Sequence, residues 1–383
     1  MSEPASLAPA FDLLAAYEPG GVLVERAGLG VATGAAGRWV PAGEVGAALR
    51  AAPTGTVAAG VLPFDGSGDL WIADRTVRRT EPGVTRLAGP PSAFTSVRGR
   101  SAPAAAFSPL QRRPHPAPEA YATAVGAAVA DIRAGELRKV VLARTLEVDA
   151  GRTLDPVALA HRLRAVNPDA WTFAAPGGEG TLVGASPELL VARRGRTVRS
   201  NPLAGTAPRA GDPVEDHANA DRLLASPKDR EEHAIVVDAV AATLGGVCDD
   251  LVWDPEPILQ ATPTVWHLST RFEGTLRAPA PSALELAVLL HPTPAIGGWP
   301  VAPALDSIAR MEPFDRGGYA GPVGWVDGEG DGEFAIALRC ALLRGDRATL
   351  FAGAGIVAAS EPAAELDETE RKFVSFLEAL RWG

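Results

Sequence analysis

Two segments of the chain each present a pair of carboxylates three residues apart. The first, Ser226-Pro-Lys-Asp-Arg-Glu-Glu-His233, offers a capping serine and a proline suited to the first helical position, so a helix is predicted to begin there. Residues three apart share one face of a helix, so Asp229 lies beside Glu232. In a second predicted helix, Glu365 lies beside Glu368 in the same way. Two such helices could form the all-oxygen site that Mg²⁺ prefers, although each pair alone is typical of the acidic residues found near helix N-termini.

Lysine is rare in this chain, and the three lysines lie close in sequence to these acidic pairs or to a strand end. Lysine and arginine together number 36, yet only Lys139, Lys228 and Lys372 are lysines. A lysine can lose its proton when buried and then act as a base, whereas an arginine effectively cannot. The three positions are therefore candidates for chemistry that needs an amine. The alternative is that they persist by chance in an arginine-rich composition.

Composition excludes several classes of protein. A chain of 383 residues with 46% hydrophobic residues can bury a large core, and a net charge of −10 argues against non-specific nucleic-acid binding. The two cysteines, Cys248 and Cys340, form no CxxC motif, which favours a reducing cytoplasm. The N-terminus lacks the basic and apolar regions of a signal peptide, and no apolar run approaches the roughly 18 residues that a membrane span requires. We therefore expect a cytoplasmic protein that binds neither nucleic acid nor membrane.

The predicted elements indicate an α+β fold with mostly antiparallel sheets. Apolar residues recur at helical spacing from Tyr121 to Gly135, and Lys139 to Val148 then alternates as a strand does. Ala88 to Pro118 is rich in Pro, Ser and Ala and is predicted to be a long connection. Further helices are predicted at 156–166, 227–244, 283–290 and 361–380, and further strands at 21–25, 56–62, 70–73, 171–175, 181–185, 188–193, 265–276, 318–326, 333–343 and 349–353.

Several motifs in a fixed order resemble the chorismate-binding enzyme family, from about Tyr121 to Leu380. These motifs read KVVLART, SPELLV, NPLAGT, SPKDREEH, HPTPAIGGWP, DGEFAIALRC and LFAGAG. The resemblance implies one α+β domain over residues 1–383, with large antiparallel sheets packed as a sandwich and helices outside. Within it, residues 1–117 would be a divergent N-terminal part and residues 118–383 the part that bears the motifs.

The segment His291 to Gly298 distinguishes activities within the family. HPTPAIGG resembles the isochorismate synthase version, whereas anthranilate and aminodeoxychorismate synthases more often have a Phe-Pro opening and end in Ala-Pro-Lys. Salicylate synthases share the His-Pro opening and usually differ after it, so a salicylate synthase remains an alternative. A catalytically silent relative that binds chorismate or a partner protein is a second alternative, and a large subunit that depends on an amidotransferase is a third.

The resemblance implies conversion of chorismate to isochorismate, in which water adds at ring C2 while the C4 hydroxyl leaves. Lys139 matches the base that activates the water, and it must be uncharged when it acts. Glu188 matches the general acid, which must be protonated when it acts and so needs an apolar setting. The ammonia-using enzymes usually lack a lysine at the position of Lys139, which argues against amination.

The resemblance also implies one Mg²⁺ ion and a set of substrate contacts. Glu232 and Glu368 match the direct metal ligands, and Asp229 and Glu365 match partners that hold metal-bound waters. The residues that match contacts to chorismate are Gly205, Thr206, His291, Thr293, Tyr319, Arg339, Gly353, Gly355 and Lys372. Tyr319 and Arg339 would bind the enolpyruvyl carboxylate. The family also implies an enzyme that works as a monomer without an amidotransferase subunit.

Overall fold

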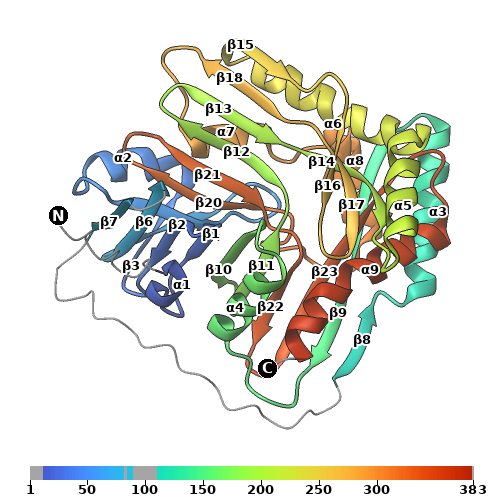
Figure 1. Cartoon of the computed structure of the whole chain (residues 1–383), viewed down its shortest axis with the longest axis horizontal. Helices are drawn as coiled ribbons and strands as arrows, with labels where there is room; N and C mark the ends of the chain where they lie inside the picture. Colours follow the sequence, from blue (N-terminus) through green and yellow to red (C-terminus); the bar gives the residue numbers. More distant parts are fainter. Residues whose placement is uncertain (1–11, 82–83, 89–109, 382–383) are drawn as a thin grey trace, which may run out of the picture.

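Two large antiparallel sheets form the body of the protein, with helices on their outer sides (Figure 1). The computed structural model describes residues 12–81, 84–88 and 110–381. One sheet has 11 strands, the second has 9, and a separate sheet has 3. The predicted α+β fold with mostly antiparallel sheets is therefore confirmed.

The 11-stranded sheet contains the predicted strand that begins at Lys139. Its order is β19 (Gly298–Trp299), β9 (Lys139–Asp149), β23 (Arg347–Ile356), β22 (Cys340–Arg344), β11 (Gly180–Ser186), β10 (Trp171–Gly177), β1 (Leu23–Arg26), β2 (Leu29–Thr33), β6 (Thr76–Glu81) and β7 (Val84–Ala88), and β8 (Gln111–His115) also pairs with β9. Strands β9 and β23 pair along ten residues, from Val140 opposite Ile356 to Asp149 opposite Arg347. This long pairing fixes β9, the strand that begins with the predicted catalytic lysine.

The other two sheets carry the remaining strands. The 9-stranded sheet runs β15 (Cys248–Trp253), β18 (Phe272–Leu276), β13 (Thr197–Asn201), β12 (Leu189–Arg194), β21 (Gly332–Ile336), β20 (Pro322–Asp327), β4 (Val57–Val61), β5 (Asp69–Ala73) and β3 (Gly37–Pro41). The 3-stranded sheet runs β14 (Leu203–Pro208), β17 (Val265–Ser269) and β16 (Ile258–Ala261).

Strands from the N-terminal part complete both large sheets. Strand β1 pairs with β10, and β4 pairs with β20, so the blue strands of Figure 1 lie beside strands that are far away in sequence. The apolar side chains of Val24, Val57 and Leu70 pack in one buried cluster with Phe173 and Trp325. The first third of the chain thus shares its core with the rest.

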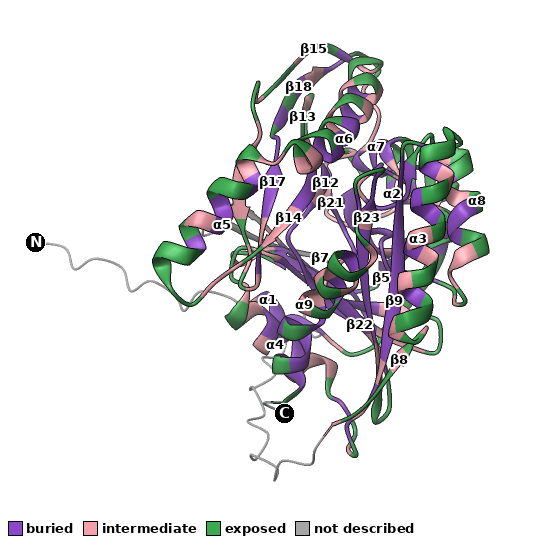
Figure 2. Cartoon of the chain, turned by 90° about the vertical axis from the view of Figure 1, so that its right-hand side faces the viewer, coloured by how far each residue is buried: buried purple, intermediate pink, exposed green. Residues whose placement is uncertain are grey.

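The helices of the described residues include the five predicted at 121–135, 156–166, 227–244, 283–290 and 361–380, which begin and end close to the predicted residues, and others at 13–16, 45–50 and 213–225 that were not predicted. They are α1 (Leu13–Ala16), α2 (Val45–Arg50), α3 (Pro118–Ala134), α4 (Pro156–Val166), α5 (Pro213–Ala225), α6 (Pro227–Gly245), α7 (Ala283–Leu290), α8 (Val301–Met311) and α9 (Pro362–Arg381). Their outward faces are exposed, whereas the strands behind them are buried (Figure 2). Within the described ranges, none of these helices has both the length and the apolar character needed to span a bilayer.

Three strand predictions and one connection need correction. The predicted strands 265–276 and 333–343 each divide into two strands that belong to different sheets, β17 with β18 and β21 with β22. The strand predicted at 318–326 begins only at Pro322, so Tyr319 lies in the preceding turn. The predicted connection 88–118 contains strand β8, and its residues 89–109 lie outside the described residues.

Candidate active site

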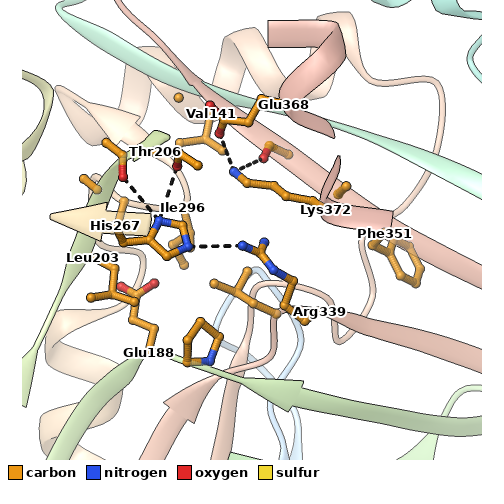
Figure 3. A pocket seen from close by; sticks show the side chains of 18 of the residues that line it. Val141, Glu188, Leu203, Thr206, His267, Ile296, Arg339, Phe351, Glu368 and Lys372 are labelled. Carbon is orange, nitrogen blue, oxygen red and sulfur yellow. Dashed lines mark hydrogen bonds and ion pairs between the residues drawn. The ribbon is translucent and has the colours of Figure 1, made fainter. Parts of the chain in front are cut away.

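A cavity lies where both acidic helices, the 3-stranded sheet and strands β9 and β23 meet. Of the fifteen predicted site residues, those that line it are Glu188, Gly205, Thr206, Glu232, Tyr319, Arg339, Gly353, Gly355, Glu368 and Lys372. Figure 3 shows Glu188 on one side and Glu368 with Lys372 on the other, with His267 and Arg339 between them. Among these predicted residues, the fold brings together positions as far apart as Glu188 and Lys372, 184 residues.

The first acidic pair lies at the start of α6, as predicted. The Ser226 hydroxyl accepts a hydrogen bond from the backbone N–H of Asp229 at 3.2 Å, and Pro227 occupies the first turn. Glu232 reaches the cavity one turn later, and Asp229 lies behind it against Gly205. Helix α9 presents Glu368 to the same cavity.

Each of the three lysines forms an ion pair with one of the predicted metal-site acids. Lys139 Nζ lies 3.0 Å from Glu232 Oε1. Lys228 Nζ lies 2.7 Å from Glu365 Oε1. Lys372 pairs with Glu368 one helical turn earlier and also donates to the carbonyl of Gly353 at 2.8 Å. The three lysines that stand out in this arginine-rich sequence are therefore all ion-pair partners of these acids.

Burial and mutual repulsion perturb the carboxylates. Burial and the charge of Glu368 raise the pKa of Glu365. Burial also raises the pKa of Asp229, with added repulsion from Glu232 and Glu368. Burial opposes ionisation of Glu368 as well, but the ammonium group of Lys372 outweighs it and lowers the pKa. The acids therefore act electrostatically as one group.

The donor set of this group fits a hard divalent cation. All four acids offer carboxylate oxygens, which Mg²⁺ prefers, and their mutual repulsion is what such a cation would relieve. Among the described residues, no three acidic, histidine or cysteine side chains already converge on one point. Three of the four carboxylates form ion pairs with lysine ammonium groups.

Lys139 lies behind the cavity wall and does not line it. It is on β9 with 0% exposure, and its amine makes no aligned hydrogen bond to the other described groups beyond the ion pair with Glu232. A Cβ at Gly355 would lie 2.1 Å from Glu232 Oε1 and 3.2 Å from Lys139 Cε. Only glycine at this position allows the carboxylate and the amine to approach the strand, so Gly355 opens the space between Lys139 and the cavity.

Glu188 is a buried acid on the opposite side of the cavity. It follows β11 and is 3% exposed. Burial raises its pKa to about 7, although the backbone N–H of Leu203 and the charges of Lys139 and Arg339 oppose the rise. A carboxyl group with this pKa can be protonated near neutral pH and can donate its proton.

Arg339, Tyr319 and His267 form one wall of the cavity. Arg339 lies between β21 and β22 in the left-handed region, at φ 49°, and donates to His267 Nε2 at 3.1 Å. Nδ1 of His267 therefore carries the proton and donates to the carbonyl of Gly205 at 3.2 Å. Tyr319 stacks on Phe351 with ring centroids 5.0 Å apart. Sequence reasoning missed His267, because a single histidine on an alternating strand has no distinguishing pattern.

The segment after α7 reaches the cavity through residues other than those predicted. His291 caps α7 and donates from Nε2 to the carbonyl of Phe64 at 2.8 Å, and it lines a separate cavity together with Thr293. The backbone turns at Thr293, whose carbonyl accepts from Ile296 and Gly297. Ala295 and Ile296 consequently line the cavity that contains Glu188 and Glu232, whereas His291 and Thr293 do not.

Comparison with known proteins assigns this site to a family. A family model described as chorismate binding enzyme matches residues 87–381, which is most of the chain. The chain belongs to the chorismate-binding enzyme family. The family predicted from the sequence motifs is therefore confirmed.

Several of the most similar relatives are isochorismate synthases. The isochorismate synthase DhbC of Bacillus subtilis is 46% identical over 275 residues, covering 70% of this chain and 69% of DhbC. The isochorismate synthase EntC of Escherichia coli is 43% identical, covering 70% and 68%. The solved structure of MenF, the menaquinone-specific isochorismate synthase of Escherichia coli, is 26% identical with a TM-score of 0.85, over 98% of this chain and 92% of MenF. These relatives confirm the prediction of an enzyme of this type.

Proposed function

We propose that this chorismate-binding enzyme is a Mg²⁺-dependent isochorismate synthase. The observation that carries the proposal is a pair of buried proton-transfer groups at separate points of one cavity. Glu188, with a pKa of about 7, lines the cavity, and Lys139 lies behind Glu232, which also lines it. Addition of water at one ring carbon and departure of a hydroxyl from another need a base and an acid that are separated in this way.

Lys139 and Glu188 divide the proton transfers between them. Lys139, in its uncharged form, takes a proton from the water that attacks ring C2. Glu188, in its protonated form, gives a proton to the oxygen that leaves ring C4, and the ring double bonds shift between these carbons. The exchange conserves atoms and electrons, since one water enters and one water leaves. For Lys139 to act, its ion pair with Glu232 must be released.

Glu232 and Glu368 are the residues that would hold Mg²⁺, with Asp229 and Glu365 around them. When bound, the cation would neutralise the ring carboxylate of chorismate and withdraw electrons from the ring. Both direct ligands line the cavity, and the two outer acids lie behind them. Glu232→Gln and Glu368→Gln should each weaken Mg²⁺ binding in a calorimetric titration. A titration identical to wild type in both variants would contradict the metal site.

The polar wall opposite the metal site fits the second carboxylate of chorismate. Arg339 can bind the enolpyruvyl carboxylate through two N–H groups, because His267 occupies only one of its nitrogens. The Tyr319 hydroxyl lies on the same cavity and adds a donor. The ammonium group of Lys372, beside Glu368, would add positive charge near the ring end of the substrate. Thr206 and the backbones of Gly205 and Gly353 complete the walls.

The product would serve the biosynthesis of a siderophore, menaquinone or a related compound; among the named relatives, MenF is described as menaquinone-specific. The enzyme would act alone as a monomer, without an amidotransferase subunit. A salicylate synthase would use the same groups and then eliminate pyruvate. A catalytically silent paralogue would have no need for a carboxyl group whose pKa is raised to about 7. The raised pKa of Glu188 therefore argues against that alternative.

The decisive experiment is a product analysis of the purified protein with chorismate and Mg²⁺, with and without ammonium. Chromatography and mass spectrometry should show isochorismate and no pyruvate. Salicylate with pyruvate would identify a salicylate synthase. An aminated product that appears only with ammonium would contradict the role of Lys139 as the base for water.

A further inference from the structure

Lys228 is the one lysine of this chain to which the proposed reaction gives no role. Its ammonium group lies 2.7 Å from Glu365 Oε1, and it extends from the first turn of α6 to the first turn of α9. The lysine is partly open to solvent, with a side-chain exposure of 30%, whereas the Glu365 side chain is 2% exposed. One accessible ammonium group therefore neutralises one inaccessible carboxylate on the neighbouring helix.

Glu365 needs this partner because of its surroundings. It is buried beside Glu368, whose charge repels it, and the charges of Glu232 and Asp229 also reach Lys228. A buried ion pair that loses one partner is strongly destabilised, because the other charge remains buried without compensation. Across the site as a whole, three ammonium groups face four carboxylates.

The three lysines are not equivalent. Lys139 and Lys372 contact the acids that line the cavity, Glu232 and Glu368, and both are assigned to the chemistry or the substrate. The ion pair of Lys228 among the described residues is with Glu365, which lies behind the cavity. It can therefore keep its partner whether or not a cation and substrate occupy the cavity.

We propose that Lys228 is a built-in counter-ion of the acidic site, a positioning residue that holds Glu365 and the starts of α6 and α9 in place while no divalent cation is bound. This inference rests on the proposed Mg²⁺ site. A bound cation and Lys228 then compensate the same group of carboxylates. Loss of Lys228 should consequently harm the metal-free protein more than the metal-bound one.

The test is thermal unfolding of Lys228→Met with and without saturating Mg²⁺, in the absence of substrate. In metal-free buffer the variant should unfold about 3–6 °C below wild type. Mg²⁺ should raise its Tm by more than it raises that of wild type and should restore at least half of the loss, since a ligand stabilises by its affinity for the folded state. Calorimetry should show that Lys228→Met binds Mg²⁺ several-fold more tightly than wild type does. Lys228→Arg, which keeps the charge, should behave as wild type.

Arg230→Met provides the matched control. Arg230 lies two residues further along α6 and forms an exposed ion pair with Glu256, so its loss should leave the Mg²⁺-induced shift unchanged. An equal fall in Tm for Lys228→Met with and without Mg²⁺, or no fall at all, would overturn the inference. If Lys228→Met folds only when Mg²⁺ is present, the inference is supported.

A second measurement separates this inference from the metal site itself. Absence of any Mg²⁺-induced shift in wild type would contradict the proposed cation and not the ion pair. In that case, a double-mutant cycle with Glu365→Gln in metal-free buffer still measures the ion pair, because Lys228→Met should cost less stability once Glu365 has lost its charge. Additive effects of the two substitutions would show that Lys228 does not act through Glu365.

Discussion

At the scale of single residues, the environment of Glu188 determines the direction of the pH dependence. Burial raises its pKa to about 7, and its role as an acid requires the protonated form. As pH rises through 7 the protonated fraction falls, so kcat of wild type should fall above this pH. Glu188→Gln should lower kcat by about 10²–10⁴-fold and remove this alkaline limb, while chorismate still binds. The measurement is kcat between pH 5.5 and 9, and an unchanged limb in the variant would contradict the assignment.

Lys139 provides a test of why lysine persists where arginine is otherwise so common. Lys139→Arg keeps a positive charge beside Glu232 and should therefore retain chorismate and Mg²⁺ binding, yet it should lose turnover as completely as Lys139→Ala, because a guanidinium cannot accept a proton. Binding by calorimetry and turnover by chromatography separate the two effects. Turnover of Lys139→Arg near the wild-type level would show that the charge and not the base is what matters.

At the scale of elements, a buried arginine joins the segment that distinguishes activities to the strand that carries Lys139. Arg316, 3% exposed, donates to the carbonyls of Ile296 and Val141 at 2.8 and 2.7 Å. It also pairs with Glu312, which accepts a hydrogen bond from the backbone N–H of Ala143 at 2.7 Å. The position of Ile296 in the cavity wall therefore depends on the planar fork of one guanidinium.

Arg316→Lys should loosen this wall, because an ammonium group cannot donate to the same set of acceptors at once. We expect KM for chorismate to rise several-fold and pyruvate to appear beside isochorismate, since a mobile wall lets the enolpyruvyl group reach the geometry for elimination. Arg144→Lys is the control: Arg144 is equally buried on β9 but pairs with Glu370. Equal changes in both variants would indicate a loss of stability and not of substrate positioning.

The sequence predicts the helices of this protein and their acidic faces better than it predicts the points at which the chain leaves one sheet and enters another. Helix α7 spans Ala283–Leu290 as predicted, because Ser282 and Glu285 form a capping box at its start. The strands at 265–276 and 333–343 were each predicted as a single strand, because the alternation of residue types continues across the point where the chain passes from one sheet to the next. Nothing in the residue type of Arg339 signals its left-handed backbone, at φ 49°.

The candidate site follows the same division. The pairs at spacing three were predictable, because helix geometry alone places Glu232 near Asp229 and Glu368 near Glu365. The ion pair between Lys139 and Glu232 was not, since residues 93 positions apart meet only through the packing of α6 against the sheets.

At the scale of the whole molecule, the two parts of the chain do not have separate cores. Strand β1 pairs with β10 in one sheet and β4 with β20 in the other, and Val24, Val57 and Leu70 are buried against side chains of the C-terminal part. The part that bears the motifs would expose the unpaired edges of β10, β20 and part of β9, together with a large apolar face, if it were alone. Such surfaces lead to aggregation.

Residues 118–383 expressed alone should therefore be insoluble or lack cooperative unfolding, although they contain all fifteen predicted site residues. Fragments 1–88 and 110–383, produced together, retain the strand pairs that join the sheets and should assemble into a complex that unfolds cooperatively. Size-exclusion chromatography, circular dichroism and chorismate turnover measure these outcomes. A soluble 118–383 fragment with native-like unfolding would contradict the shared core. Failure of the paired fragments to assemble would show that the covalent connection between residues 88 and 110 is needed to bring β1 and β4 to their partners. In the intact chain the two parts are already joined, so folding does not include the loss of entropy that association of two fragments requires.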